Sequence, residues 1–254
     1  MSRITRRQFL RLTTLAVAGA AGTHAAAIEP TRLRTTNLAL NPTGKLRLVQ
    51  FTDFHYKGDA GYAAEVIAAI NALEPQLVCF TGDLVEDKHF APGALEFVRQ
   101  INAPVYGSPG NHDYWCGADF ELYEEAFAAT GGGWLVDRSV VIAEHDLEIV
   151  GMAKKGIHAL KPPQATRRIL LLHYPEMADR LQGPTYDLIL AGHSHGGQVR
   201  LPFYGAPMLP YGVGRYDMGY FESKGGPLYV NVGIGTYHLP IRFNCRPELT
   251  LVKL

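Results

Sequence analysis

Seven residues of the types that bind metal ions stand close to apolar stretches of this 254-residue chain: Asp53, His55, Asp83, Asn111, His173, His193 and His195. Imidazole and carboxylate groups with one amide oxygen suit Zn, Mn or Fe, and a set without a thiolate cluster fits a structural zinc finger poorly. Two pairs, Asp53-x-His55 and His193-x-His195, place side chains two residues apart. On an extended segment such side chains point the same way, so we expect both members of a pair to reach one centre.

Two metal ions held by such groups would perform hydrolytic chemistry. Ions about 3.5–4 Å apart need a bridging carboxylate, and the water that they share has its pKa lowered from 15.7 to about 7. Asp83, which follows Gly82, is the candidate bridge. Glycines beside Asp83, Asn111 and His193 allow the backbone to turn sharply and to approach the ions.

Short apolar runs, which we predict to be strands, must position these residues. The runs span residues 45–51, 76–80, 105–106, 169–172 and 187–190, and each ends shortly before a polar cluster. In open α/β sheets, sites form beyond the carboxyl ends of the strands, where loops converge. We therefore expect five strand ends to deliver metal-binding side chains to one edge.

The remaining pattern predicts a layered α/β domain with a mixed core. Helical periodicity indicates helices at residues 62–73, 91–101, 119–129 and 175–181. Further strands are expected at 134–136, 140–144, 147–151, 228–232 and 248–253. Residues 201–220, rich in proline, glycine and aromatic residues, are predicted to form a loop over the site, either a surface excursion or a lid that grips substrate.

The polar clusters form five motifs in a fixed order: Asp53-x-His55, Gly82-Asp83, Gly110-Asn111-His112-Asp113, His173 and Gly192-His193-Ser194-His195. This ordered set resembles the motifs of the calcineurin-like metallophosphoesterases. The resemblance implies an α/β fold of four layers, in which two β-sheets are flanked by helices. It also implies a phosphodiesterase or phosphatase with two divalent or trivalent metal ions (Mn, Zn or Fe), whose bridging hydroxide attacks phosphorus in line with the leaving oxygen.

The same resemblance implies a role for each residue. The implied ligands of one ion are Asp53, His55, Asp83 and His195, and those of the other ion are Asp83, Asn111, His173 and His193. His112 would be the acid or hydrogen-bond donor at the phosphate, and Asp113 would orient it. Of the other aromatic residues here, Tyr114 and Trp115 would either pack or stack on substrate, and His238 would line the cleft if it contributes to the site.

A narrower resemblance concerns the segments beyond the metal motifs. Residues 192–202, Gly214-Arg215-Tyr216 and the glycines and prolines of residues 233–248 are similar to a small bacterial branch of the family. Some members of that branch are exported, and some are assigned to phospholipid-like or UDP-diacylglucosamine substrates. Here Asn231-Val232 stands where Ser-Arg is expected before the glycine, so the substrate class does not carry over directly.

The composition bears on two alternative functions, a nuclease and a metal-binding protein without turnover. Lys plus Arg and Asp plus Glu number 24 each, so the chain has no net positive field to recruit nucleic acid. This balance argues against the nuclease hypothesis. A metal-binding protein without turnover is the other alternative, against which the His112-Asp113 pair argues. The expected partner is a phosphorylated small molecule or lipid. Three cysteines are too few for a disulfide framework: Cys79 is predicted to be buried, and a bond between Cys116 and Cys245 stays open.

The first 27 residues have the pattern of an export signal. Arg3, Arg6, Arg7 and Arg11 precede a short apolar run and then Ala25-Ala26-Ala27, and this run is too short for a spanning helix. Residues 5–10, Thr-Arg-Arg-Gln-Phe-Leu, resemble the twin-arginine motif, which implies export through that machinery in folded form. We therefore expect residues 28–254 to form one metallophosphoesterase domain in the periplasm or on the outer face of the cytoplasmic membrane, with cleavage and membrane-surface association left open.

Overall fold

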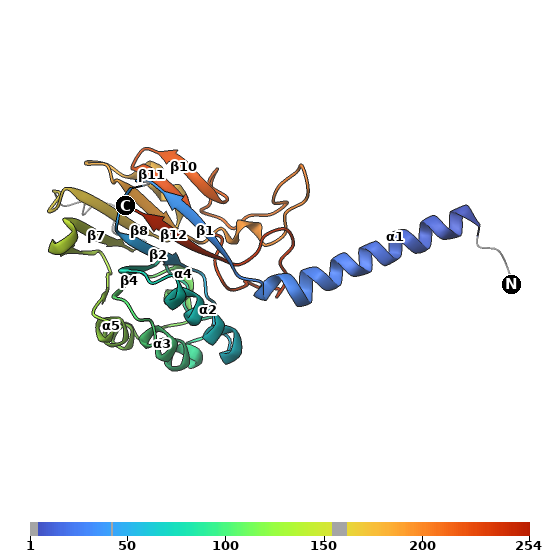
Figure 1. The fold of residues 1–254 in the computed structure, drawn as a ribbon, viewed down its shortest axis with the longest axis horizontal. Helices are drawn as coiled ribbons and strands as arrows, with labels where there is room; N and C mark the ends of the chain where they lie inside the picture. Colours follow the sequence, from blue (N-terminus) through green and yellow to red (C-terminus); the bar gives the residue numbers. More distant parts are fainter. Residues whose placement is uncertain (1–4, 42, 154–161) are drawn as a thin grey trace.

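The apolar runs of the chain assemble into two six-stranded sheets (Figure 1). The structure is a computed structural model that describes residues 5–41, 43–153 and 162–254. The first sheet has the order β1 (Arg34–Ala39), β12 (Glu248–Lys253), β2 (Arg47–Phe51), β3 (Leu77–Phe80), β4 (Val105–Gly107) and β5 (Gly133–Trp134). The second has the order β10 (Gly219–Ser223), β11 (Gly226–Val230), β9 (Leu188–Ala191), β8 (Arg167–Leu172), β7 (Leu147–Met152) and β6 (Arg138–Ile142).

Parallel pairing gives each sheet an edge where strands end together. Strands β2, β3, β4 and β5 are parallel in the first sheet, and β7, β8, β9 and β11 are parallel in the second. The central strands β3 and β9 are buried along their whole length, as expected for strands covered on both faces. Consequently the loops that follow β2, β3, β4, β8 and β9 begin at common edges.

The helices lie mainly on the outer face of the first sheet (Figure 1). They are α1 (Arg6–Thr23), α2 (Ala60–Ala72), α3 (Ala91–Arg99), α4 (Asn111–Trp115) and α5 (Phe120–Ala129). Shorter helical turns are η1 (His24–Ile28), η2 (Glu29–Thr31), η3 (Lys88–Phe90), η4 (Ala143–His145), η6 (Pro175–Arg180) and η7 (His195–Gly197). Helices α2, α3 and α5 bury one face each against the first sheet, with Ile70, Leu95 and Phe127 in the same cluster as Phe51 and Phe80.

A second apolar cluster joins the two sheets. Leu77 and Cys79 from the first sheet pack with Leu171 and Leu190 from the second, and full burial of one such side chain contributes about 1.5–3 kcal/mol. A third cluster on the outer face of the second sheet includes Tyr216 and is covered by η6. This arrangement confirms the predicted sandwich of two sheets flanked by helices. Its outermost layer on the second sheet is a 3₁₀ helix and a loop.

Several local expectations need correction. The helix expected at residues 175–181 is the 3₁₀ helix η6, which ends before Leu181 takes an extended conformation. The last residues of the loop expected at 201–220 enter β10, and β1 was not predicted because its sequence is polar and alternates between half-buried and exposed positions. All three cysteines are free, and Cys79 is buried as predicted.

The N-terminal helix α1 projects away from the two sheets (Figure 1). Thr5 and Gln8 form a capping box at its start, since the Thr5 hydroxyl accepts from the Gln8 amide and the Gln8 side chain accepts from Thr5. In the three described ranges, no helix has the length and apolarity needed to cross a membrane. Residues 1–4 of the expected export signal, including Arg3, lie outside the described residues.

Candidate metal centre

Five strand ends converge on one buried site. Asp53 and His55 follow β2, Asp83 follows β3, Asn111 begins α4 after β4, His173 follows β8, and His193 and His195 follow β9. All seven of these residues are buried. The structure therefore brings together every residue that the sequence predicts as a metal ligand.

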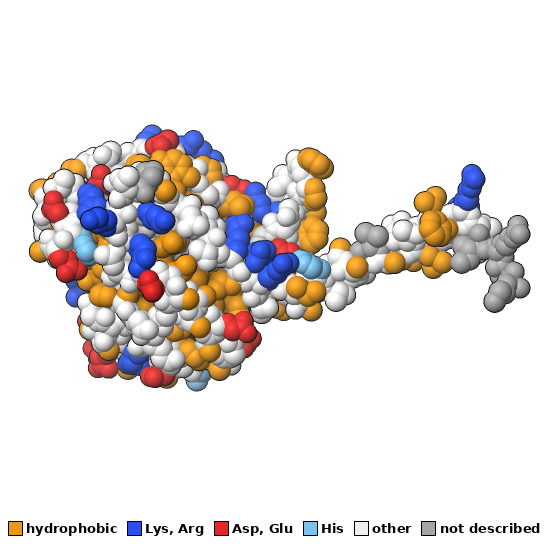
Figure 2. All heavy atoms as spheres, viewed as in Figure 1, with side chains coloured by type: hydrophobic (Ala, Val, Ile, Leu, Met, Phe, Trp, Pro, Cys, Tyr) orange, Lys and Arg blue, Asp and Glu red, His pale blue; other side chains and the backbone are white. Residues whose placement is uncertain are grey.

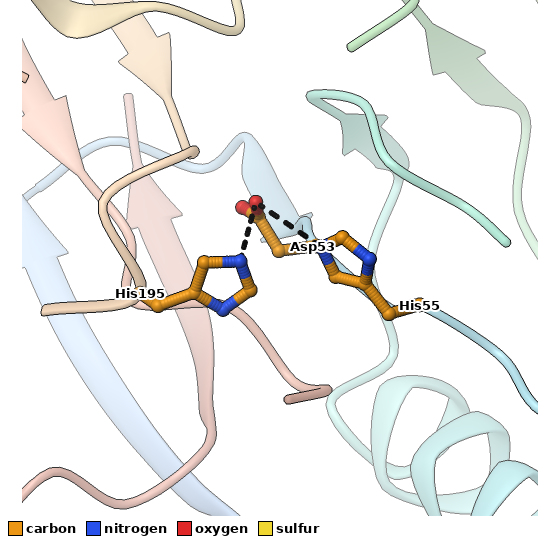
Figure 3. Close-up of side chains that lie close together, drawn as sticks. All are labelled: Asp53, His55 and His195. Carbon is orange, nitrogen blue, oxygen red and sulfur yellow. Dashed lines mark ion pairs between the residues drawn. The ribbon is translucent and has the colours of Figure 1, made fainter. Parts of the chain in front are cut away.

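The first group of side chains contains Asp53, His55 and His195 (Figure 3). The Asp53 Oδ1 atom lies 3.4 Å from His195 Nε2 and 4.0 Å from His55 Nε2. The Asp53 carboxylate also accepts a hydrogen bond of 2.8 Å from the Thr52 hydroxyl and one of 2.9 Å from the His193 amide. These bonds hold the carboxylate between the two imidazoles.

The second group contains Asp83, His173 and His193, with Asn111 beside them. His173 Nε2 lies 3.2 Å from Asp83 Oδ2, 3.1 Å from Asn111 Oδ1 and 3.2 Å from His193 Nδ1. His173 thus meets a carboxylate, an amide and a second imidazole through one ring nitrogen.

Asp83 lies between the two groups. Its Oδ2 atom is 3.6 Å from His55 Nε2 on one side and 3.2 Å from His173 Nε2 on the other. Its Oδ1 atom accepts a hydrogen bond of 2.7 Å from the His112 amide, which holds the carboxylate in this orientation. The position is the one that a bridging carboxylate requires.

Outer hydrogen bonds determine which nitrogen three of the four histidines present to the centre, whereas His195 Nδ1 is buried without a hydrogen-bond partner in the described chain. His55 Nδ1 pairs with the Glu86 carboxylate at 2.9 Å, His173 Nδ1 donates to the Thr81 carbonyl at 2.7 Å, and His193 Nε2 donates to the Tyr211 carbonyl at 2.7 Å. In the neutral form of these rings, which a metal ion requires, the opposite nitrogen is unprotonated and faces inward. Histidine ligands of protein metal sites have this arrangement.

The donor set fits a pair of cations. In their neutral forms His173 and His193 direct lone pairs at one another at 3.2 Å, and His55 Nε2 is buried without a hydrogen-bond partner among the described residues. Such contacts are unfavourable unless positive charge lies between the atoms. Ligand atoms about 2.0–2.2 Å from an ion lie about 3 Å or slightly more from one another. The contacts of His173 and the Asp53–His195 contact have such separations, and the two contacts of His55 Nε2 are wider, at 3.6 and 4.0 Å.

The electrostatics of the site also favour cation binding. Burial and the neighbouring His173 lower the pKa of His193 to about 4, and burial lowers the pKa of His195 well below its ordinary value. Both imidazoles are therefore neutral at pH 7 and available as ligands. Burial also disfavours the charged form of His173, but the facing Asp83 and Asp53 carboxylates outweigh it and raise its pKa to about 9. The carboxylates thus attract positive charge to the centre, either as a proton on His173 or as a metal ion that would displace this proton.

The backbone at this site is strained in a way that the sequence did not reveal. The φ angles are +50° at Asp53, +44° at His55, +62° at Asp83, +67° at His193 and +48° at His195. Residues with a side chain rarely adopt this left-handed region, which costs on the order of 1–3 kcal/mol each and concentrates at functional sites. The expectation that each two-residue pair is extended was therefore wrong.

The left-handed backbone also separates the two side chains of the His193-x-His195 pair. His195 faces Asp53 and His55, whereas His193 faces His173 and Asp83, so the two members of the pair belong to different groups. The left-handed φ at both histidines, absent from an extended strand, allows this divergence. The division into two groups is the one that the family resemblance implies.

Two glycines let backbone segments approach the carboxylates closely. A Cβ atom at Gly110 would lie 2.1 Å from Asp83 Oδ1, and one at Gly192 would lie 2.3 Å from Asp53 Oδ2. Neither glycine has a left-handed backbone, so a turn is not the reason for glycine at these positions. Glycine is required because the backbone lies so close to the carboxylates. Of the glycines expected to turn the chain, Gly82 does so, with a φ of +100°.

His112 lies at the rim of the centre, but its carboxylate neighbour differs from the expected one. The Asp113 carboxylate accepts hydrogen bonds from the amides of Asp83, Leu84 and Gly110, and in the described chain none joins it to the His112 ring. His112 Nδ1 instead lies 3.6 Å from the Glu86 carboxylate. Asp113 therefore holds the loops together, and Glu86 faces the ring that Asp113 was expected to orient.

Sequence reasoning missed Glu86 and the residues that close the site from the side. Glu86 follows Asp83 by three positions, a separation that carried no recognised motif. Tyr237 places its ring 4.9 Å from His112 and 5.8 Å from His55, and Trp115 places an exposed ring 5.1 Å from His112. The His238 ring lies tilted beside Tyr237, with centroids 3.7 Å apart, and His238 lines a pocket together with His195.

Arg242 supports the back of the centre. This fully buried guanidinium donates to the carbonyls of Val232, Gly233, Gly235 and Cys245. The amide of Gly235 in turn donates to the Asp53 carbonyl at 2.8 Å. Burial of one charged group among backbone acceptors thus ties the C-terminal loop to the segment that carries Asp53.

Comparison with known proteins places this geometry in a family. Residues 46–197 match the model of the calcineurin-like phosphoesterases. The chain is 31% identical to the uncharacterized metallophosphoesterase YkuE of Bacillus subtilis, over 100% of this chain and 99% of that protein. It is 29% identical to the phosphodiesterase YaeI of Escherichia coli, over 99% of each chain.

A third relative has a more specific name. The chain is 25% identical to the UDP-2,3-diacylglucosamine pyrophosphatase LpxG of Chlamydia trachomatis, over 89% of this chain and 90% of that protein. The family match covers the strands that carry all seven predicted ligands, from β2 to the loop after β9. This chain therefore belongs to the calcineurin-like phosphoesterase family, and it is a hydrolase that acts on phosphoester bonds.

Proposed function

We propose that the chain is a dinuclear metal-dependent phosphodiesterase or pyrophosphatase. The observation that carries the proposal is the position of the Asp83 carboxylate, which lies 3.6 Å from His55 on one side and 3.2 Å from His173 on the other. Asp53, His55 and His195 would complete one site, and Asn111, His173 and His193 the other. When bound, two Mn, Zn or Fe ions would supply a hydroxide nucleophile at neutral pH and neutralise charge on the phosphate.

The chain's own residues position and protonate the substrate in this proposal. His112 lies at the rim, where its ring can donate a proton to the leaving oxygen, and such a group contributes about 10²–10⁴-fold to the rate. Glu86 faces Nδ1 of both His55 and His112, at 2.9 and 3.6 Å. It would keep His55 in the ligand tautomer and hold the proton on the neighbouring ring.

An apolar groove beside the centre supports a substrate with an apolar part. Its volume is about 460 Å³, and its lining includes His195, Met208, Leu209, Tyr237 and Leu239. An apolar lining offers few hydrogen-bond partners to a hydrophilic nucleotide, whereas it can bury an acyl chain. Together with the names of YaeI and LpxG, the groove favours phospholipid-like or UDP-diacylglucosamine-like esters.

The test is metal-dependent hydrolysis of a small diester. Protein loaded with Mn, Zn or Fe should release nitrophenol from bis-p-nitrophenyl phosphate, and a chelator should abolish the release. Two equivalents of metal per chain, measured by elemental analysis, should accompany activity. Bound metal without turnover would favour the metal-binding alternative, and a steep salt dependence of DNA binding would favour a nuclease.

We also propose that residues 1–27 direct export through the twin-arginine machinery, with residues 28–254 as the folded enzyme at or beyond the outer face of the cytoplasmic membrane. The paired Arg6 and Arg7 at the start of α1 support this proposal. Replacement of both by lysine should retain the protein inside cells, as measured by fractionation. Export of that variant would contradict the proposal.

A further inference from the structure

Large apolar side chains at the surface gather on one projection of the molecule. Of the 16 exposed large apolar residues in the described part of the chain, six lie in two adjacent segments, and we name them the apolar tip: Leu201, Phe203, Tyr204, Met208, Tyr211 and Leu239. Figure 2 shows this projection as an apolar ridge that stands out from the body on the side of the N-terminal helix. Exposed patches of this kind mark interaction surfaces.

A tight turn presents the most prominent of these side chains. Leu201 and Gly205 exchange two backbone hydrogen bonds, of 2.8 and 3.0 Å, and so place Phe203 at the end of the turn. Phe203 is fully exposed and has a φ of +65°. Glycine or asparagine would adopt this conformation at lower cost, and burial against the described residues does not compensate for an aromatic ring there. The ring is therefore suited to contact something outside the chain.

The tip is continuous with the groove beside the metal centre. Met208 and Leu239 belong to both, and the backbone of Met208 packs against Gly197, where a Cβ atom would lie 2.7 Å from the Met208 carbonyl. Gln198 donates to the carbonyls of Leu239 and Ile241, which joins the two segments of the tip at their base. An apolar path thus runs from the tip to His195.

Positively charged residues lie behind the tip. Arg200 lies under the turn, 3.7 Å from the position of a Gly205 Cβ, and pairs with Asp217 at 2.8 Å. Arg246 donates to the Arg32 carbonyl, so these two residues meet where the N-terminal segment joins the body. Figure 2 shows Lys and Arg side chains in this region, at the base of both projections. Aromatic side chains ahead of a basic rim are typical of surfaces that bind phospholipid bilayers.

The N-terminal helix leaves the body at the same end (Figure 1). The Ala25 carbonyl accepts a hydrogen bond of 2.9 Å from the Arg242 amide, next to the Ile241 wall of the groove, and this contact anchors the start of the projection. Helix α1 carries exposed Phe9, Leu10 and Leu12. Two projections that carry exposed apolar side chains on one end, with basic residues at their base, fit an extended lipid surface better than a compact protein partner.

We propose that the apolar tip inserts into the interfacial layer of a phospholipid bilayer. The groove then opens onto the lipid, and an acyl chain enters it while the phosphoester reaches the metal centre. Delivery of the phosphoester to the metal centre rests on the proposed function, because it requires hydrolysis there. Insertion of the tip does not, since it depends only on the exposed residues.

Vesicle flotation tests the insertion. Full-length protein should float with vesicles of phosphatidylglycerol and phosphatidylethanolamine, and the double variant Phe203→Asn with Tyr204→Ser should partition at least about 10-fold less, because two aromatic rings lose their burial in lipid. Asparagine tolerates the left-handed φ of position 203. The matched control, Leu122→Ser with Val141→Ser, removes two exposed apolar side chains on α5 and β6 and should float like the parent protein.

The outcomes separate insertion from catalysis. Equal flotation of the tip variant and the parent would overturn the insertion, whether or not the protein hydrolyses phosphoesters. Reduced flotation of the tip variant, in a protein that hydrolyses no phosphoester with any metal, would keep the insertion and refute the proposed function. If light scattering shows a dimer that the tip variant abolishes, a second copy and not a bilayer covers the tip.

Discussion

The metal centre and the apolar tip differ in nearly every physical respect. The seven candidate ligands are buried at strand ends, and five of them have a left-handed backbone. Outer hydrogen bonds hold three of the four histidines. The tip is an exposed turn with neighbouring exposed apolar side chains, and it contacts the centre through backbone, since the Tyr211 carbonyl accepts from His193. Chemistry requires fixed distances, which rigid strands provide, whereas contact with a fluid surface requires exposed apolar area. The two regions should therefore fail independently.

The largest effect is expected from removal of the bridge. Asp83→Asn keeps an oxygen that accepts from the His112 amide but removes the charge shared by both groups. We expect both ions to be lost and hydrolysis to fall by at least about 10⁴-fold, because neither hydroxide formation nor charge neutralisation remains. Elemental analysis and nitrophenol release measure the two effects, and vesicle flotation should stay unchanged.

A control for this variant is Asp87→Asn, four residues away on the exposed surface, which should keep both ions. Full metal content in Asp83→Asn would remove Asp83 as the bridge. A parallel loss of flotation would show that the two regions are coupled.

The next effect separates metal binding from proton transfer. His112→Ala should keep both ions and lower kcat by about 10²–10⁴-fold, because the proton donor at the leaving oxygen is lost while the metal ligands remain. Steady-state kinetics and metal analysis check the prediction. The exposed His89→Ala serves as control. A collapse of metal content would show that His112 is a ligand. Its ring lies close enough to His55 and Asp83 for that role.

A glycine tests how closely the backbone must approach the bridge. Gly110→Ala would place a methyl group 2.1 Å from Asp83 Oδ1 and must displace that carboxylate. We expect metal affinity and activity to fall by about 10²-fold or more, since a small misplacement of catalytic groups is costly. Gly61→Ala at the start of α2, which has an ordinary backbone and no close neighbour, should leave both unchanged. Normal metal binding in Gly110→Ala would show that the centre is more adaptable than its packing indicates.

A smaller effect is expected at the outer carboxylate. Glu86→Ala should weaken metal binding by about 10–100-fold, because His55 loses the partner that sets its tautomer. Glu86→Gln, which can still accept from His55 Nδ1, should recover most of the affinity. Metal titration followed by calorimetry distinguishes the two variants. Equal metal affinities of the parent and the alanine variant would show that Glu86 does not support His55 as a ligand.

The smallest effect is expected at an exposed aromatic ring beside His112. Trp115→Ala removes an exposed ring 5.1 Å from His112 and should raise KM by about 2–10-fold with kcat nearly unchanged, if the ring stacks on substrate. The readout is the ratio of the two constants on a small diester and on a lipid. An unchanged KM for both substrates would assign the ring to packing.

Much of the fold was predictable because its strands are locally encoded. Runs such as residues 76–80 are apolar, β-rich and bounded by turn residues, and the helices at α2, α3 and α5 have one apolar face. Strand β1 escaped prediction because it is polar and half-buried, and it forms by pairing with β12, over 200 residues away. Pairing of that kind leaves no local pattern.

The sequence by itself determined which residues form the centre, because each candidate ligand follows an apolar strand within a few positions. Only the tertiary structure decided how they are shared: the His193 amide reaches Asp53 across 140 residues, and His193 and His195 diverge to different groups. It also decided that Glu86, not Asp113, faces His112, and that a groove leads from the centre to an exposed tip. These features depend on contacts between segments far apart in the chain and on left-handed backbone angles, neither of which spacing or composition encodes.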